Sequence, residues 1–473
     1  MKVLIACVGS RGDVEPYVAI ADRLLQDGHQ VEFVVQPELK HLVPTTTTQA
    51  EKNNNNSPIH VHEWSFTQYD FYMYAANPTR GAELEGRFKF TAIVADILGE
   101  LVLPNWKMVL DAAAGCDLVI TSTLARPLCF AVAQKLKLPT VLINLQPIVP
   151  TKLFPHFSQQ DDFVQTLLDL NKTTEDATAA DDDDDVGSDE FRDYYLTLEK
   201  HQHDFLQERL DKVYEEMELE SSKMDFDTLQ EILTGHHPSV FVGNAFFDTL
   251  IPKIADGGPN VHHISSLADH YIPKDFEPPQ NVVDFLNQSS DKPICVGFGS
   301  MPYSQVSLIL KALQKLGQRA ILIGKALELP KPEDDGDGND DGLSDWVESN
   351  VLQAHSLPYA WLLPQCQMML SHGGAGVTQA TLRAGIPPVI GPFMGDQFVF
   401  ADLMEVKGLG ARVGIGRSLG EATEADFVAA MEKAMTCIEA AKQFGENVRS
   451  QPLGVDNLMK LITEQVVLPT NNK

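Results

Sequence analysis

The chain has 473 residues, 44% of them hydrophobic, which is about three times the length of a typical single-core domain and predicts two α/β domains. Its 66 acidic and 36 basic residues give a formal net charge of -30, which argues against nucleic acid as a partner, because electrostatic steering toward polyanions is unfavourable. The six cysteines follow no metal or CxxC spacing, so we expect reduced core residues in a cytoplasmic protein.

The first elements in the chain follow a strand, loop and helix pattern. An apolar run at residues 1–8 leads through a glycine-containing loop at residues 9–13 into a helix, which carries Val14, Val18, Ala21 and Leu25 at helical spacing and which Gly28 ends. Residues 31–35 form the next predicted strand, and such βαβ units predict a parallel sheet. Further buried strands are predicted at residues 118–121, 140–143, 240–243, 294–298, 320–323, 368–370 and 388–390.

The domain change is predicted where proline, glycine and asparagine accumulate, at residues 257–287, before a second strand-then-glycine unit at 292–300. We therefore expect an N-terminal domain at residues 1–250 and a C-terminal domain at residues 251–473. Two acidic, low-complexity segments are expected to be insertions without a core, at about residues 171–190 and 332–342.

The second insertion matches the spacing of a calcium-binding loop, but the match is weak. Pro330 and Pro332 argue against an incoming helix, so a solvated acidic loop is the expectation and no metal site is predicted. The matching residues are Asp337, Asn339, Asp341, Gly342 and Glu348.

The strongest functional pattern spans residues 371–378 and continues through 384–388 and 391–397. A predicted strand runs into a glycine-rich turn and then a helix, so backbone N–H groups and the helix dipole can face an anion such as a diphosphate. His372 can add a hydrogen bond or a positive charge. The alternative is an ordinary turn with a capping histidine.

This segment resembles the donor-binding signature of the family 1 glycosyltransferases, and residues 9–16 (GSRGDVEP) resemble the sterol and antibiotic glucosyltransferase branch. Further similarity lies at residues 154–156, 298–301 and 357–362. The resemblance implies an α/β GT-B fold of two facing Rossmann-like domains with parallel sheets and an active-site cleft between them. It also implies a UDP-glycosyltransferase that moves a hexose such as glucose onto a hydroxyl of a sterol or other apolar acceptor, with inversion and with no metal or other cofactor.

The resemblance assigns the donor site residue by residue. His372, Gly374, Ala375 and Gly376 would hold the diphosphate, while Asp396 and Gln397 would bind sugar hydroxyls. Val377 stands where relatives have a phosphate-binding Ser or Thr, and no tryptophan is found for stacking on the base, so UDP and dTDP both remain open. The donor-binding residues are Gly12, Gly299, Ser300, His355, Ser356, His372, Gly374, Ala375, Gly376, Thr378, Asp396 and Gln397.

Asp13 is the candidate general base, because it stands three residues before Pro16, where plant relatives carry a catalytic histidine three residues before a proline. A carboxylate there could accept the proton of the acceptor hydroxyl. Ser122 stands where those relatives have an aspartate that orients the histidine. The alternative is that Asp13 only N-caps a helix beginning at Val14.

Aromatic residues crowd residues 64–74 and predict an acceptor site, for which Trp64, Phe66 and Tyr72 are candidates together with His156. Ordinary core packing explains the same aromatic residues equally well. The expected partners are a nucleotide-sugar donor and a lipophilic hydroxylated acceptor, which a peripheral membrane contact would help the protein to reach.

Two other functions remain to be weighed. An NAD-dependent dehydrogenase lacks support, because the first turn is not GxGxxG and Gln36 replaces the acidic residue that binds ribose. A non-catalytic sugar-nucleotide or lipid-binding protein on the same fold stays open, although the presence of Asp13, His372, Asp396 and Gln397 together favours an enzyme.

Overall fold

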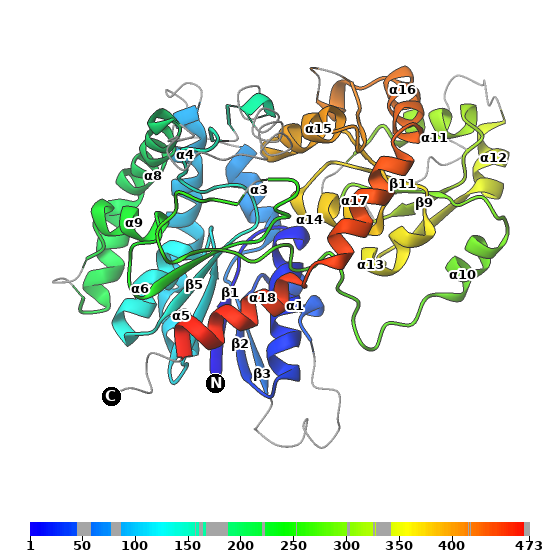
Figure 1. The fold of residues 1–473 in the computed structure, drawn as a ribbon. Helices are drawn as coiled ribbons and strands as arrows, with labels where there is room; N and C mark the ends of the chain where they lie inside the picture. The colour runs from blue at the N-terminus through cyan, green and yellow to red at the C-terminus, as the bar shows by residue number, and fades with distance from the viewer. Residues whose placement is uncertain are drawn as a thin grey trace. The chain divides into compact units, whose positions relative to one another are not determined.

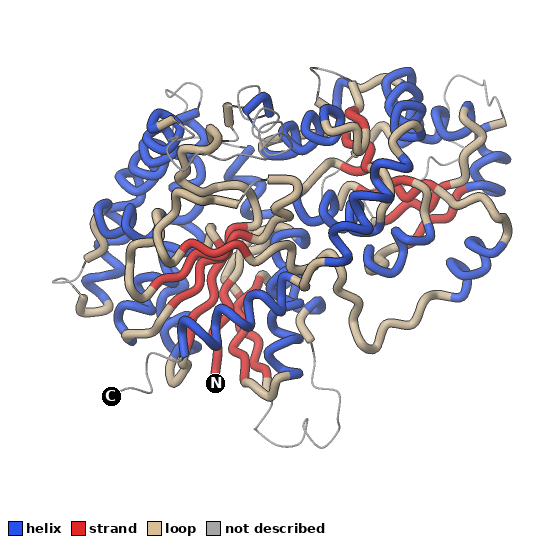
Figure 2. Tube along the Cα trace, viewed as in Figure 1, coloured by secondary structure: helices blue, strands red, loops and turns tan. Residues whose placement is uncertain are grey.

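The computed structural model describes residues 1–44, 58–76, 87–156, 158–159, 164–166, 188–219, 223–251, 253–299, 303–324, 327, 342–414, 416 and 418–467. Two compact units are present: the first comprises Met1–Leu267 and Leu453–Lys473, and the second comprises Ala268–Pro452. Each unit is built around its own sheet, and Figure 2 shows the strands in two separate groups.

The first unit contains a seven-stranded parallel sheet with the spatial order β3-β2-β1-β4-β5-β6-β7. Its strands are β1 (Lys2–Ala6), β2 (Gln30–Val35), β3 (Ile59–Glu63), β4 (Leu118–Ser122), β5 (Thr140–Asn144), β6 (Val240–Asn244) and β7 (Val261–His263). The predicted strands near residues 1–8, 31–35, 118–121, 140–143 and 240–243 are confirmed. The short strands β3 and β7 were not predicted, because their sequences are polar.

Helices cover both faces of this sheet (Figure 1). Since β-α-β connections are right-handed, the helix between β1 and β2 and the helix between β4 and β5 lie on opposite faces. The helices of the first unit are α1 (Arg11–Gln26), α3 (Gln68–Ala76), α4 (Arg87–Ile97), α5 (Trp106–Ala113), α6 (Arg126–Leu136), α8 (Asp189–Glu216), α9 (Phe226–Leu233) and α18 (Gly454–Leu461). Short 3₁₀ or π segments add Pro37–Leu42, Leu98–Val102, Leu103–Asn105 and Ile462–Val467.

Helix α1 begins earlier than the sequence pattern suggested. Ser10 is its N-cap residue and Arg11 its first residue, whereas the apolar periodicity begins only at Val14. The expectation that Asp13 could N-cap the helix is therefore wrong, because the cap position belongs to Ser10. Asp13 occupies the third helical position, where a carboxylate completes a capping box.

The second unit contains a six-stranded parallel sheet with the order β10-β9-β8-β11-β12-β13. Its strands are β8 (Ile294–Gly297), β9 (Ala320–Ile323), β10 (Val351–Ala354), β11 (Met368–Ser371), β12 (Pro388–Ile390) and β13 (Ala411–Arg412). Its helices are α10 (Gln280–Asn287), α11 (Val306–Lys315), α12 (Leu343–Asn350), α13 (Tyr359–Leu362), α14 (Ala375–Ala384), α15 (Asp396–Val406), α16 (Glu424–Met435) and α17 (Ile438–Ser450), with 3₁₀ turns at Leu363–Gln365 and Leu419–Glu421.

Both faces of the second sheet are buried, which explains why its strands are continuous apolar runs in the sequence. Alternate residues of one strand enter different cores: Ile294 and Val296 pack with α11 and α16, whereas Cys295 packs with α13 and α14. The strands predicted at 294–298, 320–323, 368–370 and 388–390 are confirmed.

The division into units differs from the expected boundary between residues 250 and 251. Strand β7 pairs with β6 and so extends the first sheet, which moves the boundary to Leu267. At the other end of the chain, α18 returns to the first unit and contacts α1. There Asn457 donates a hydrogen bond to the carbonyl of Ile264 at 3.2 Å. No local pattern in the sequence predicts that α18 packs on the first unit.

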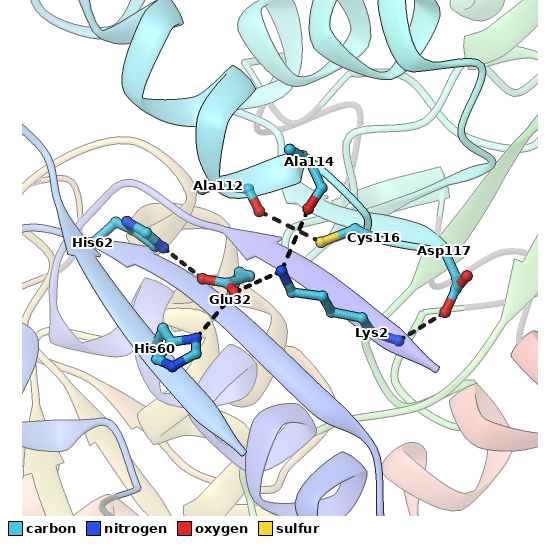
Figure 3. Close-up of polar contacts among 8 residues, drawn as sticks. All are labelled: Lys2, Glu32, His60, His62, Ala112, Ala114, Cys116 and Asp117. Carbon is cyan, nitrogen blue, oxygen red and sulfur yellow. Dashed lines mark hydrogen bonds and ion pairs between the residues drawn. The ribbon is translucent and has the colours of Figure 1, made fainter. Parts of the chain in front are cut away.

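The edge strand β3 is joined to its neighbours by a polar cluster around Glu32, a largely buried residue on β2 (Figure 3). The carboxylate of Glu32 contacts His62 Nε2 at 2.6 Å, His60 Nδ1 at 3.1 Å and Lys2 Nζ at 2.9 Å. Burial raises the pKa of Glu32, but hydrogen bonds from His62, Lys2 and His60 outweigh burial and lower its pKa. The cluster therefore stabilises the charged carboxylate between three strands.

All six cysteines are unpaired and buried, as expected for core residues. Within the described part of the chain, no helix is both long and apolar enough to cross a membrane. Of the expected insertion at 171–190, residues 188–190 are described: Ser188 caps α8, and Asp189 begins it. Of the insertion at 332–342, only Gly342 is described, as the N-cap of α12.

Candidate active site

Both sheets reverse their strand order at one point, and Asp13, Gly299 and His372 follow strands that flank these points. In the first sheet the reversal lies between β1 and β4, and in the second between β8 and β11. Loops that follow such strands diverge and leave room for ligands in open parallel sheets. Each unit therefore has one topologically favoured edge.

In the first unit, the loop after β1 holds Asp13 by two hydrogen bonds from one residue. Asp13 Oδ2 accepts from the backbone N of Ser10 at 2.7 Å and from Ser10 Oγ at 2.8 Å. Gly9 has φ +146°, and a Cβ atom built there would lie 2.5 Å from the side chain of Asp13. The loop thus requires glycine at position 9 so that the carboxylate can fold back against the main chain.

Three glutamine side chains from distant segments fix the same loop. Gln36, directly after β2, and Gln68, at the start of α3, donate from Nε2 to the carbonyl of Gly9 at 2.8 and 3.1 Å. Gln146, which follows β5, donates from Nε2 to Asp13 Oδ1 at 3.5 Å. Sequence reasoning missed the roles of these glutamines. Gln36 and Gln146 stand just beyond apolar strands, which was a usable signal, whereas Gln68 follows the polar strand β3 and had none.

The environment of Asp13 favours its protonated form more than water does. Burial raises the pKa of Asp13, and the hydrogen bonds from Ser10 and Gln146 lower it in part, with a net increase. A carboxylate with a raised pKa is a stronger base once ionised, as general-base catalysis requires.

Ser122, which stands where relatives have an orienting aspartate, has a structural task here. Its Oγ accepts hydrogen bonds from the backbone N of Val8 at 3.2 Å and of Ala125 at 3.3 Å. It thereby connects the ends of β1 and β4 at the reversal point.

In the second unit, the strand, glycine turn and helix predicted at residues 368–378 are confirmed. Strand β11 ends at Ser371, and α14 begins at Ala375 with Gly374 as N-cap. Gly373 has φ +83°, and a Cβ there would lie 2.3 Å from Ile390. The N–H groups of the first helical turn lack intrahelical partners and point away from the helix, an arrangement suited to an anion.

The ring of His372 lies between two glycines of this edge. A Cβ atom built at Gly374 would be 2.8 Å from His372 Nε2, and one built at Gly299 would be 3.5 Å from Cε1. Its buried Nδ1 has no hydrogen-bond partner among the described residues. Because burial lowers the pKa of His372 to about 4, the side chain is a neutral hydrogen-bonding group at neutral pH.

The remaining donor candidates occupy different positions. Asp396 is the first residue of α15, and buried Gln397 accepts from the backbone N of Phe393 at 2.8 Å and of Met394 at 3.1 Å. The carboxamide oxygen of Gln397 therefore fixes the loop at residues 393–394. Its amide hydrogens are the candidates for hydrogen bonds to a sugar hydroxyl.

The other five donor candidates differ in exposure where they are described. His355 and Ser356 are exposed just after β10, and Gly12 is exposed in α1 of the first unit. Thr378 is fully buried in α14, and its hydroxyl has no hydrogen-bond partner among the described residues, so its role in donor binding stays a prediction. Ser300 lies outside the described residues.

The aromatic candidates for acceptor binding are corrected in part. Trp64 and Phe66 belong to the hydrophobic core, at 1% and 3% exposure, and Trp64 Nε1 donates to the carbonyl of Cys7 at 2.8 Å. Core packing, the alternative explanation, therefore accounts for both. The side chain of Tyr72 lies outside the described residues.

His156 is partly buried beside α8, 5.3 Å from the ring of Tyr195. Burial lowers the pKa of His156 to about 4, and the charge of Glu199 opposes the shift. No group of three or more metal-ligating side chains occurs in the described part of the chain. Three residues of the calcium-like pattern, Asp337, Asn339 and Asp341, lie outside it.

Two family matches cover parts of the chain. Residues 3–52 match the glycosyltransferase family 28 N-terminal domain, and residues 336–463 match the erythromycin biosynthesis protein CIII-like C-terminal domain. The first match contains the Asp13 loop, and the second contains the His372 turn.

Curated relatives extend the similarity over most of the chain. Sterol 3-beta-glucosyltransferase UGT80A2 of Arabidopsis thaliana is 25% identical over 87% of the chain, and the sterol 3-beta-glucosyltransferase of Komagataella phaffii is 26% identical over 95%. The chain spans 57% of the length of the first relative and 33% of the second.

Solved structures share the fold. The glycotransferase of kitacinnamycin matches with a TM-score of 0.59 at 14% identity, covering 98% of this chain and 99% of the other. The spinosyn rhamnosyltransferase SpnG, complexed with thymidine diphosphate, matches with a TM-score of 0.57 at 15% identity, covering 98% and 100%. With two parallel sheets flanked by helices, the chain therefore has the α/β GT-B fold of these glycosyltransferases, and its sequence is similar to the sterol 3-beta-glucosyltransferases.

Proposed function

We propose that this protein is a UDP-glycosyltransferase that moves a hexose, with glucose as the first candidate, onto a hydroxyl of a sterol or similar lipophilic acceptor. The observation that carries the proposal is the carboxylate of Asp13, held by Ser10 and Gln146 at the reversal point of the first sheet with a raised pKa. The sterol glucosyltransferases that match most of the chain support this acceptor class.

The reaction we propose is a single displacement. Asp13 accepts the proton of the acceptor hydroxyl while its oxygen attacks the anomeric carbon, and the bond from that carbon to the diphosphate oxygen breaks. The product then has inverted configuration. The leaving diphosphate would be stabilised by the first-turn N–H groups of α14 and by His372, without a metal ion.

The proposal also covers how the sugar is recognised and where the enzyme acts. Asp396 and the amide group of Gln397 follow β12 in the second unit and offer hydrogen bonds matched to hexose hydroxyls. We infer a cytoplasmic enzyme that reaches its acceptor by peripheral contact with a membrane. Thermal shifts measured with UDP and with dTDP decide which nucleotide the protein prefers.

The direct test is transfer from UDP-glucose to a sterol such as ergosterol, followed by mass spectrometry of the product. Asp13→Asn keeps the size of the side chain, so turnover should fall roughly 10²- to 10⁴-fold while UDP-glucose binding stays nearly unchanged. Asp27→Asn, an exposed carboxylate at the other end of α1, is the matched control and should keep normal turnover. Near-normal transfer by Asp13→Asn would remove Asp13 as the base.

A non-catalytic sugar-nucleotide or lipid-binding protein is the second candidate, and the same preparation separates the two. Such a protein would bind UDP-glucose or the lipid but neither transfer nor hydrolyse the sugar, and Asp13→Asn would leave every measured property unchanged.

A further inference from the structure

The two carboxylate oxygens of Asp13 have different surroundings. Oδ2 accepts two short hydrogen bonds from Ser10, one from the backbone and one from the hydroxyl. Oδ1 faces Gln146 Nε2 at 3.5 Å. Because each carboxylate oxygen has about two acceptor sites, Ser10 occupies both sites of Oδ2, whereas Oδ1 keeps one site for a proton.

The position of Gln146 is fixed by the main chain and by the first helix. The carbonyl of Gln146 accepts from the backbone N of Ile148 at 2.7 Å, which makes a tight turn after β5. Buried Tyr17 of α1 donates from its hydroxyl to the carbonyl of Ile143 in β5 at 3.3 Å. Since Tyr17 lies one helical turn after Asp13, this contact links the strand that carries Gln146 to the helix that carries the base.

We propose that Gln146 is a positioning residue for the base: its Nε2–H holds Oδ1 of Asp13 in the orientation in which that oxygen receives the acceptor proton. This inference rests on the proposed function. The proton moves from the acceptor oxygen to Oδ1, the acceptor oxygen bonds to the anomeric carbon, and the electron pair of the broken bond leaves with the diphosphate. Gln146 itself gains and loses no proton.

The side chain at position 146 should set the pKa of Asp13, and the pH dependence of sugar transfer measures that pKa. A neutral N–H donor favours the ionised carboxylate and opposes the effect of burial on the pKa of Asp13. Replacing the donor by an apolar group should therefore raise the pKa of Asp13, and replacing it by a second carboxylate should raise the pKa further, because two nearby like charges disfavour ionisation.

The experiment measures kcat/KM for sugar transfer against pH in Gln146→Leu and Gln146→Glu. Gln146→Leu should lower kcat/KM about 2- to 10-fold at neutral pH, the usual range for one neutral hydrogen bond, and should move the acidic limb of the profile to higher pH. Gln146→Glu, which has nearly the same shape, should move that limb further. UDP-glucose affinity should change less than about twofold, because every donor candidate except Gly12 lies in the other unit.

Gln207→Leu is the matched control, since Gln207 Nε2 also donates to an aspartate, Asp211, at 2.8 Å but on α8. Its pH profile should equal that of the wild type. An unmoved acidic limb in both Gln146 variants, with Asp13→Asn inactive, would overturn the inference and leave the proposed function standing. A shift in Gln146→Glu alone would also count against it, since the added charge rather than the lost donor would then be the cause. Active Asp13→Asn would instead overturn the proposed function.

Discussion

The favoured edges of the two units differ in how far protein groups satisfy their hydrogen-bonding side chains. In the first unit, the loop after β1 is held by protein groups, since Ser10 and Gln146 donate to Asp13 and two more glutamines donate to Gly9. In the second unit, the turn after β11 leaves the buried Nδ1 of His372 without a partner among the described residues. The difference teaches that the first edge is organised before any ligand binds, whereas the second is left for a ligand to complete.

The largest effect expected of ligand binding on stability concerns the edge of the second unit that contains His372. UDP should stabilise the protein with no added metal, by about 2.7 kcal/mol at a concentration 100 times its dissociation constant, because the proposed mechanism assigns the role of a cation to N–H groups and a histidine. A thermal shift with UDP, dTDP and EDTA measures the effect. Loss of the shift in EDTA would refute the metal-free proposal, and a larger shift with dTDP would change the assigned nucleotide.

The second prediction removes the side chain that lacks a partner. His372→Ala should weaken UDP binding roughly tenfold or more, because a hydrogen bond to a charged group contributes about 1.5–3 kcal/mol. Stability without ligand should fall little, since Nδ1 of the neutral side chain has no described partner to lose. Calorimetric titration measures the affinity, and His41→Ala, which changes an exposed histidine of the first unit, should bind UDP normally.

The third prediction separates the sugar from the nucleotide at the same edge. Asp396→Asn should reduce UDP-glucose affinity by about 1 kcal/mol, the usual value of one hydrogen bond, while leaving UDP affinity unchanged. Glu424→Gln, in the first turn of α16, is the control. Equal losses for UDP and UDP-glucose would assign Asp396 to the diphosphate instead.

The smallest expected effect concerns the Glu32 cluster, which is fully paired and lies away from the Asp13 loop and the His372 turn. We expect this cluster to stabilise the fold without taking part in catalysis. Glu32→Gln should lower the free energy of unfolding by about 1 kcal/mol and leave transfer unchanged. The folded-state pKa of Glu32 lies below its ordinary value of 4.5, so its contribution is present above that value and disappears as the pH falls through the folded-state pKa.

Urea denaturation at several pH values measures this difference. Glu63→Gln is the matched control, because Glu63 forms a more exposed pair with Lys40 at 2.6 Å and should matter less. A difference between wild type and Glu32→Gln that grows on acidification would contradict the assigned direction of the pKa shift.

Several features could be predicted from short stretches of sequence. Buried parallel strands are nearly continuous apolar runs, and the glycine turn before α14 is a local pattern, so both were visible without the fold. Polar strands were not visible: β3 carries His60 and His62, which are tolerated because Glu32 accepts hydrogen bonds from both.

The sequence by itself determined the α/β class, the presence of two units and His372 as a candidate, because periodicity and glycine turns act over a few residues. Asp13 became a candidate only through the resemblance to the family 1 glycosyltransferases. Only the tertiary structure decided that Gln146, 133 residues away in the chain, contacts Asp13. It also decided that Thr378 and Trp64 are buried and that α18 returns to the first unit. These outcomes depend on which distant segments pack together, and the composition or spacing within one segment does not predict that packing.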